Sequence, residues 1–203
     1  MKKLTAKRMV LIAVLGTLAY ILMLLRFPLP FMPPFMDFDL AAVPELLGTL
    51  ILGPTAGILI VTIKLLIKIV TTGSNSMFTG ELQNFLLSVS YLLPAWLLYR
   101  RKKTKRSMLL GMLGGTFFVT SVACFTNIYL IIPFYSALYG LSMEAIIAMT
   151  QAVNSYVDSV WKLVVIGIVP FNLIKYGATS LVIYLTIDRL RIVFRRWENQ
   201  DGI

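Results

Sequence analysis

The 203-residue sequence has no histidine, a single cysteine and only 14% charged residues. Without histidine, the chain lacks the side chain most often used as a general base, proton shuttle or metal ligand. The lone Cys124 can form no disulfide framework. No P-loop, nucleophile motif or pair of catalytic carboxylates is present. We therefore expect no enzyme activity, no catalytic cofactor, no metal site and no ATP hydrolysis by this chain alone.

Apolar residues, by contrast, make up 58% of the chain, and its mean hydropathy is +0.83. No ordinary water-soluble domain of this size has such a composition. A membrane-spanning helix needs about 20 apolar residues, and the hydrophobic stretches lie at 9–27, 40–70, 85–99, 108–133 and 160–187. The net charge of +10 gathers at the edges of these stretches, which indicates orientation in a membrane and not nucleic-acid binding.

Three basic clusters fix the expected topology, because Lys and Arg concentrate on the cytoplasmic side. They lie at 2–8, 100–106 and 189–196. An even number of crossings must separate the first two clusters, so 40–70 is expected to be a hairpin of two helices broken at Gly53-Pro54. We predict an all-α integral membrane protein of one domain, residues 1–203, in the bacterial plasma membrane with both termini cytoplasmic. The six predicted spans are approximately 8–27, 40–52, 54–71, 81–99, 107–133 and 159–188.

Two connections on the predicted outer side are unusually apolar. The first, FPLPFMPPFMDFD at 27–39, has four prolines and four phenylalanines, so it should be extended and cover the bundle like a lid. Asp39 at its end is predicted to N-cap the next helix. The second, 134–158, has roughly helical spacing without being apolar enough to span, which predicts an interfacial helix.

Three polar side chains in the last two spans are candidate ligand contacts. Lys175 lies near the middle of its span, where a charge costs about 3 kcal/mol on insertion scales and usually marks a functional site. Asn172 lies on the same helical face, and Asn127 lies toward the outer part of the fifth span. Two amides and a cation complement a flat heterocycle with carbonyls, ring nitrogens and an N–H. The alternative is that the asparagines only join helices by hydrogen bonds.

Further polar residues occur near the outer ends of the third and fourth spans. Lys64 fits a polar pocket as well as a structural ion pair with Glu45 or Glu81. For Lys68 we expect the amine to reach the outer interface. Glu81 and Asn84 fit contacts with ligand hydroxyls as well as capping of the fourth span.

The first span has a face of small residues that a neighbouring helix can approach closely. Its members are Ala13, Gly16, Thr17 and Ala19. This face is either packed internally or docks a separate membrane subunit.

Several segments together resemble the riboflavin-specific substrate-binding subunit, or S component, of energy-coupling-factor (ECF) vitamin transporters. The resemblance covers nearly the whole chain. The segments are KRMVLIA, FPLPFMPPF followed by D-x-x-x-x-P, LGPTAG, the NF of the fourth span, NIYLIIP and IVPFNLIK.

The resemblance implies six helices around an outward-facing pocket, closed by the proline-rich connection. It implies that Asn127, Asn172 and Lys175 contact the polar edge of the isoalloxazine ring, and that Leu40, Ala41 and the Asn84 region lie near the ring or ribityl chain. The implied ligand is riboflavin, and the implied partners are a membrane coupling protein and two ABC-type ATPases. Alternatives are a flavin mononucleotide or other vitamin subunit, a lipid-modifying membrane enzyme, or a structural subunit without ligand.

Overall fold

The computed structural model describes residues 5–32, 36–74, 76–140 and 142–199, with side chains as far as Arg189 except that of Tyr139. Almost all of this chain is helical. The α-helices are α1 (Ala6–Leu24), α2 (Ala42–Leu52), α3 (Pro54–Thr72), α4 (Thr79–Lys102), α5 (Lys105–Thr126), α6 (Ile132–Tyr139), α7 (Met143–Gln151), α8 (Val160–Lys162) and α9 (Val169–Asn199). Two π-helical turns, η1 (Asn127–Ile131) and η2 (Leu163–Ile168), join α5 to α6 and α8 to α9.

Five of the helical segments are long and apolar enough to cross a membrane: 6–24, 54–72, 79–102, 105–138 and 160–189. The apolar helix α2 is shorter, with 11 residues. At 1.5 Å per residue it extends only about 16 Å. The chain is therefore a multi-pass membrane protein.

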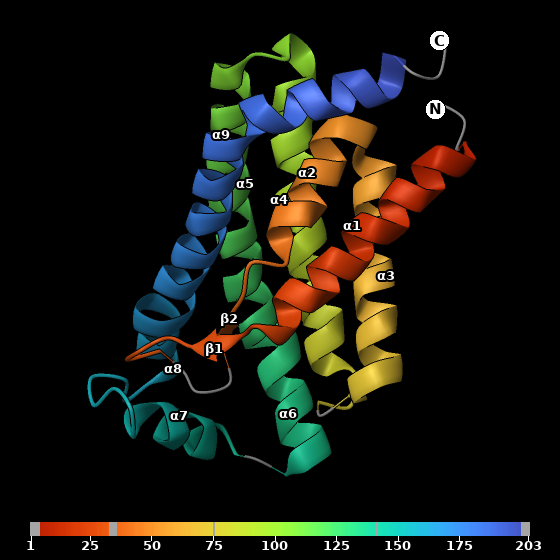
Figure 1. Cartoon of the computed structure of the whole chain (residues 1–203). Helices are drawn as coiled ribbons and strands as arrows, with labels where there is room; N and C mark the ends of the chain where they lie inside the picture. The colour runs from red at the N-terminus through yellow and green to blue at the C-terminus, as the bar shows by residue number, and fades with distance from the viewer. Residues whose placement is uncertain (1–4, 33–35, 75, 141, 200–203) are drawn as a thin grey trace.

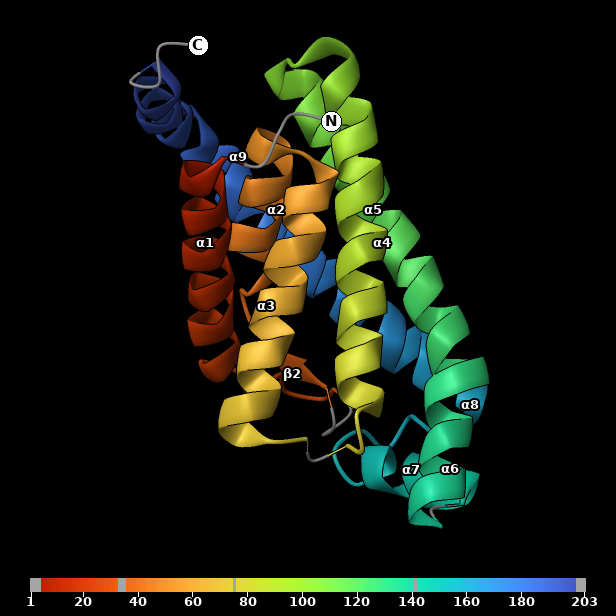
Figure 2. The ribbon, with the colours of Figure 1, turned by 90° about the vertical axis from the view of Figure 1, so that its right-hand side faces the viewer.

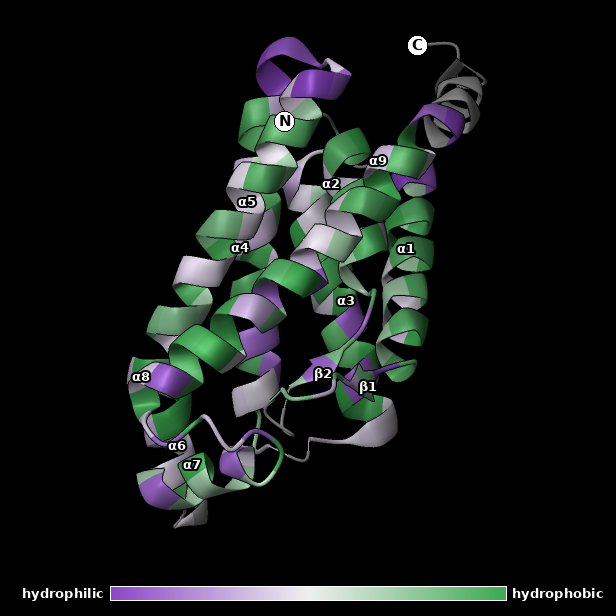
Figure 3. Cartoon of the chain, turned by 90° about the vertical axis from the view of Figure 1, so that its left-hand side faces the viewer, coloured by the Kyte–Doolittle hydropathy of each residue, from purple (hydrophilic) through white to green (hydrophobic). Residues whose placement is uncertain are grey.

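The long helices run side by side, with α2 between α1, α3 and α9 (Figures 1 and 2). The start of α1, the α4–α5 connection and the end of α9 lie at one end of the bundle, and α6 and α7 lie at the other (Figure 1). Colouring by hydropathy shows a polar α4–α5 connection, mostly apolar long helices, and hydrophilic segments of the helices in the half nearer α7 (Figure 3). Polar groups inside this half are where a ligand site can form.

The predicted break at Gly53-Pro54 is confirmed. Gly53 ends α2 with φ of 101°, a conformation that L side chains rarely adopt, and its N–H donates to the Thr49 carbonyl at 3.0 Å. Pro54 is the first residue of α3, where its missing N–H costs no helical hydrogen bond. This short turn folds α3 back against α2, and both helices pack on α1.

The proline-rich connection begins and ends as a small antiparallel hairpin. In it β1 (Phe27–Pro28) pairs with β2 (Asp37–Phe38), and the rings of Phe27 and Phe38 lie 5.4 Å apart. The tip is held by the Asn154 amide, which donates to the Phe31 carbonyl at 3.1 Å. Extended backbone is thus confirmed at both ends, while residues 33–35 lie outside the described part of the chain.

Helix bounds differ from the sequence-based expectation at several points. Asp39 does not N-cap α2: the N-cap is Ala41, whose N–H donates to Asp39 Oδ1 at 2.9 Å. The fifth helix was expected to end at Pro133, but helical structure continues to Tyr139, and the proline lies in the first turn of α6, directly after the π-turn η1. The 134–158 segment is divided at Gly140, which has φ of 63°, and only α7 forms a separate helix.

Candidate ligand-binding site

A cavity of about 390 Å³ lies among α3, α4, η1, α9 and the hairpin. Ligand pockets for small organic molecules fall in this size range. Apolar and aromatic side chains form much of its wall, including Met36, Leu87, Ile131, Tyr135 and Phe171. The cavity is closer to the α7 end of the bundle, in the half where hydrophilic residues occur within the long helices (Figure 3).

Five of the eight predicted ligand residues line this cavity, although they come from three different helical segments. They are Glu81, Asn84, Asn127, Asn172 and Lys175. The other three, Leu40, Ala41 and Lys64, are not among the residues that line it. The lining also includes polar residues that the sequence did not single out as ligand contacts: Arg26, Asp37, Asp39, Lys68, Thr72, Ser76 and Gln83.

The two asparagines are held in the same way. Asn172 Nδ2 donates to the Ile168 carbonyl at 2.8 Å, and Asn127 Nδ2 donates to the Ala123 carbonyl at 2.7 Å. Asn172 is only 1% exposed, and its Oδ1 has no hydrogen-bond partner among the described residues. A buried acceptor without a donor costs about 1–3 kcal/mol. A ligand N–H in the cavity would remove this cost.

Lys175 does not stand alone in the membrane interior. Its Nζ lies 2.7 Å from Oδ2 of Asp39, with 12% and 6% of the two side chains exposed. Asp39 belongs to the connection before α2. Burial raises the pKa of its carboxyl, but the charge and hydrogen bond of Lys175 more than offset this effect, with smaller contributions from Lys64 and the Ala41 amide. The net result is a pKa below the usual value for aspartate. The amine keeps further N–H groups with which it can bind a ligand oxygen.

A second ion pair is fully buried beside the cavity. Lys64 Nζ lies 2.5 Å from Glu45 Oε1 and 2.5 Å from Asn84 Oδ1, and the lysine and glutamate side chains are 1% and 0% exposed. The sequence left open whether Lys64 lines a polar pocket or forms a structural ion pair with Glu45 or Glu81, and the structure has it paired with Glu45. Because Asn84 does line the cavity, Lys64 positions a cavity residue without lining the cavity itself.

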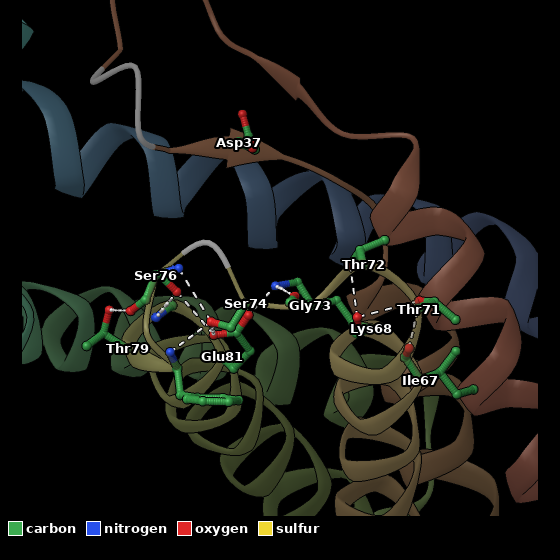
Figure 4. Close-up of polar contacts among 12 residues, drawn as sticks. Asp37, Ile67, Lys68, Thr71, Thr72, Gly73, Ser74, Ser76, Thr79 and Glu81 are labelled. Atoms are coloured by element: carbon green, nitrogen blue, oxygen red, sulfur yellow. Dashed lines mark hydrogen bonds and ion pairs between the residues drawn. The ribbon is translucent and has the colours of Figure 1, made fainter.

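A third pair closes the connection between α3 and α4. Lys68 forms an ion pair with Glu81 and donates to the Gly73 carbonyl at 2.8 Å, so its amine does not reach out to the interface as expected. Ser74 and Ser76 donate to the other oxygen of Glu81 at 2.8 and 3.1 Å. Figure 4 shows this cluster, with β2 and Asp37 on the opposite side.

The small residues of α1 do not share one environment. Ala13 and Thr17 lie on the exposed face, where they form a shallow groove with Val14, Leu18 and Ile21. Gly16 instead faces α3, and a Cβ there would lie 2.6 Å from Ile63 Cγ2. Gly16 therefore permits close packing of α1 on α3.

Comparison with known proteins gives consistent relatives across the chain. The riboflavin transporter RibU of Staphylococcus aureus (strain TCH60) is 30% identical over 94% of this chain and 93% of its own length. The riboflavin transporter FmnP of Bacillus subtilis (strain 168) is 30% identical over 96% and 95%. A solved structure described as the S component of a bacterial ECF transporter superposes with a TM-score of 0.72, at 30% identity and over 93% of this chain and 97% of that one.

The sequence profile of the family "ECF transporter, substrate-specific component" matches residues 7–187. This match covers all five long apolar segments nearly in full, together with the short α2 and the cavity. The chain belongs to the substrate-specific components of ECF transporters.

Proposed function

We propose that this protein is the riboflavin-binding subunit of an ECF vitamin importer. The observation that carries the proposal is the buried, unpartnered Oδ1 of Asn172 in the wall of a cavity that Lys175 also lines. One pyrimidine edge of the isoalloxazine ring offers an N–H between two carbonyls, which suits an acceptor beside a cation. The names of the relatives, riboflavin transporters, support the same ligand.

In this proposal the ring edge binds Asn127, Asn172 and Lys175, while the ribityl hydroxyls extend toward Asn84 and Glu81. Aromatic and apolar side chains of the cavity wall contact the ring faces. Leu40 and Ala41 adjoin Asp39, the partner of Lys175, and we assign them an indirect role through that carboxylate.

We further propose six membrane crossings with both termini in the cytoplasm. The start of α1, the end of α9 and the basic α4–α5 connection lie at one end of the bundle (Figure 1), as the distribution of Lys and Arg requires. In this orientation the hairpin and the cavity face outward. The short α2 then crosses with the connection before it inserted partly into the membrane.

The importer needs an energy source that a binding subunit does not supply. We propose that the chain associates with an ECF module of a membrane coupling protein and two ABC-type ATPases. Of the predicted docking residues, Ala13 and Thr17 are available for this contact, because the groove that they line is exposed and apolar.

The direct test is the absorption spectrum of the purified protein, followed by quenching of riboflavin fluorescence. We expect a yellow preparation, and competition by riboflavin but not by folate or thiamine. Asn172→Leu should weaken riboflavin binding at least tenfold, equivalent to about 1.4 kcal/mol. Gln151→Leu, an exposed amide on α7, is the matched control. Colourless protein that fails to quench riboflavin would refute the proposal.

A further inference from the structure

Each charged side chain in the described cavity wall forms an ion pair with one of opposite charge. Each cation that lines the cavity contacts a carboxylate that lines it too. The three pairs are Arg26 with Asp37 at 3.3 Å, Lys175 with Asp39 at 2.7 Å, and Lys68 with Glu81. Among the described lining residues, no lysine or arginine is left to neutralise an anion. The wall therefore suits a ligand without net charge.

Glu81 is the most firmly held of these carboxylates. It is 7% exposed, and besides Lys68 it accepts hydrogen bonds from the hydroxyls of Ser74 and Ser76. Figure 4 shows how these contacts join the end of α3 to the start of α4. An incoming anion could reach the Lys68 amine only by displacing this carboxylate or by lying beside it.

Alcohols and phosphates differ in what they can do at such a pair. A hydroxyl both donates and accepts, so a sugar alcohol can donate to Glu81 while it accepts from Lys68. A phosphate monoester carries nearly two negative charges at neutral pH and mainly accepts. Placed within a few ångströms of a buried carboxylate, it is repelled strongly because the surrounding dielectric is low.

We infer that the Lys68–Glu81 pair selects against phosphorylated ligands, so that the site distinguishes riboflavin from flavin mononucleotide. This inference rests on the proposed riboflavin function and adds a specificity determinant to it. Glu81 supplies the repulsion, and Lys68 limits it. The ratio of the two dissociation constants is therefore set by the charge at this end of the cavity.

The test is the riboflavin-to-flavin-mononucleotide affinity ratio, measured by fluorescence quenching in full-length protein. Glu81→Gln leaves the Lys68 charge uncompensated and should shift the ratio toward flavin mononucleotide by about tenfold or more. Lys68→Met leaves the carboxylate uncompensated and should shift it the opposite way. The double variant removes the repulsion together with the attraction that limits it, so it should shift the ratio toward flavin mononucleotide by less than Glu81→Gln alone. Glu144→Gln on the exposed start of α7 is the matched control.

Using a ratio separates specificity from folding, because a damaged pocket weakens both ligands alike. Opposite shifts in the two single variants support the inference. An unchanged ratio, or a shift in the same direction in both, overturns it while leaving riboflavin binding established. If the unmodified protein binds neither flavin, the proposed function fails and the inference fails with it. If Glu81→Gln does not accumulate, the direction of the shift in Lys68→Met decides.

Discussion

The ion pair of Lys175 with Asp39 gives the sharpest prediction, because the two residues have separable roles. Lys175→Met leaves the Asp39 carboxylate buried without its counter-charge, 2.7 Å from where the amine was. Breaking a buried ion pair by removing one partner costs about 3–5 kcal/mol. The same change removes the proposed charge-assisted hydrogen bond to the ligand, and a loss of about 1.5 kcal/mol or more should lower riboflavin affinity at least tenfold.

A double-mutant cycle distinguishes the two effects. In Lys175→Met/Asp39→Asn no uncompensated charge remains, so most of the lost stability should return, whereas riboflavin affinity should stay at least tenfold reduced. Thermal unfolding in detergent without ligand measures the first quantity, and fluorescence quenching of riboflavin measures the second. Full recovery of affinity in the double variant would show that Lys175 acts only by neutralising Asp39. Unchanged stability in the single variant would refute the buried ion pair.

Three further changes test other parts of the structure. Glu45→Gln should cost more free energy of unfolding in the ligand-free protein than free energy of riboflavin binding, because Glu45 is fully buried but does not line the cavity. A larger loss of binding free energy than of stability would contradict this. Gly111→Ala should destabilise the protein by about 1–3 kcal/mol, since the new Cβ would lie 2.5 Å from the Ala95 carbonyl oxygen. Gly114→Ala should be tolerated, because its Cβ would lie 3.4 Å from the nearest atom, Leu98 Cδ1. Equal melting temperatures of the two variants would count against close α4–α5 packing. Ala13→Trp should preserve riboflavin binding but reduce co-purification with an ECF module. Leu110→Trp, on the exposed face of α5, should leave both riboflavin binding and co-purification unchanged. Retained co-purification of Ala13→Trp would remove this face of α1 from the interface.

Much of the site could be predicted from residues whose local context is unfavourable. Asn172 and Lys175 stand out because a polar group in an apolar span needs a partner, and spacing alone places both on one face. The break at Gly53-Pro54 followed from charge parity and from two residues with restricted backbones. In each case the signal is contained within a few residues.

What the sequence did not reveal depends on tertiary structure. Asp39 pairs with a lysine 136 residues away, and by local pattern alone it resembled a helix cap. Lys68 lies near the C-terminal end of α3, where an amine could equally reach water, and only the fold of the α3–α4 connection brings Glu81 to it. The sequence alone allows each lysine several acidic partners, and the packing of the helices decides which carboxylate it meets.

The π-helical turn η2 allows the chain before Asn172 to change in length by one residue without rotating the residues that line the cavity. It precedes Asn172 by four residues, and Ile168 at its end provides the carbonyl that holds the Asn172 amide. A π-turn contains one residue more than an α-helical path would, and one residue corresponds to about 100° of helical rotation. Deleting a single residue within 163–168 therefore converts η2 to regular α-helix and leaves Asn172 at the cavity and Leu163 in the apolar cluster that it forms with Val157. Deleting one residue between Asn172 and Lys175, where the helix is regular, would instead rotate these two side chains apart by about 100°.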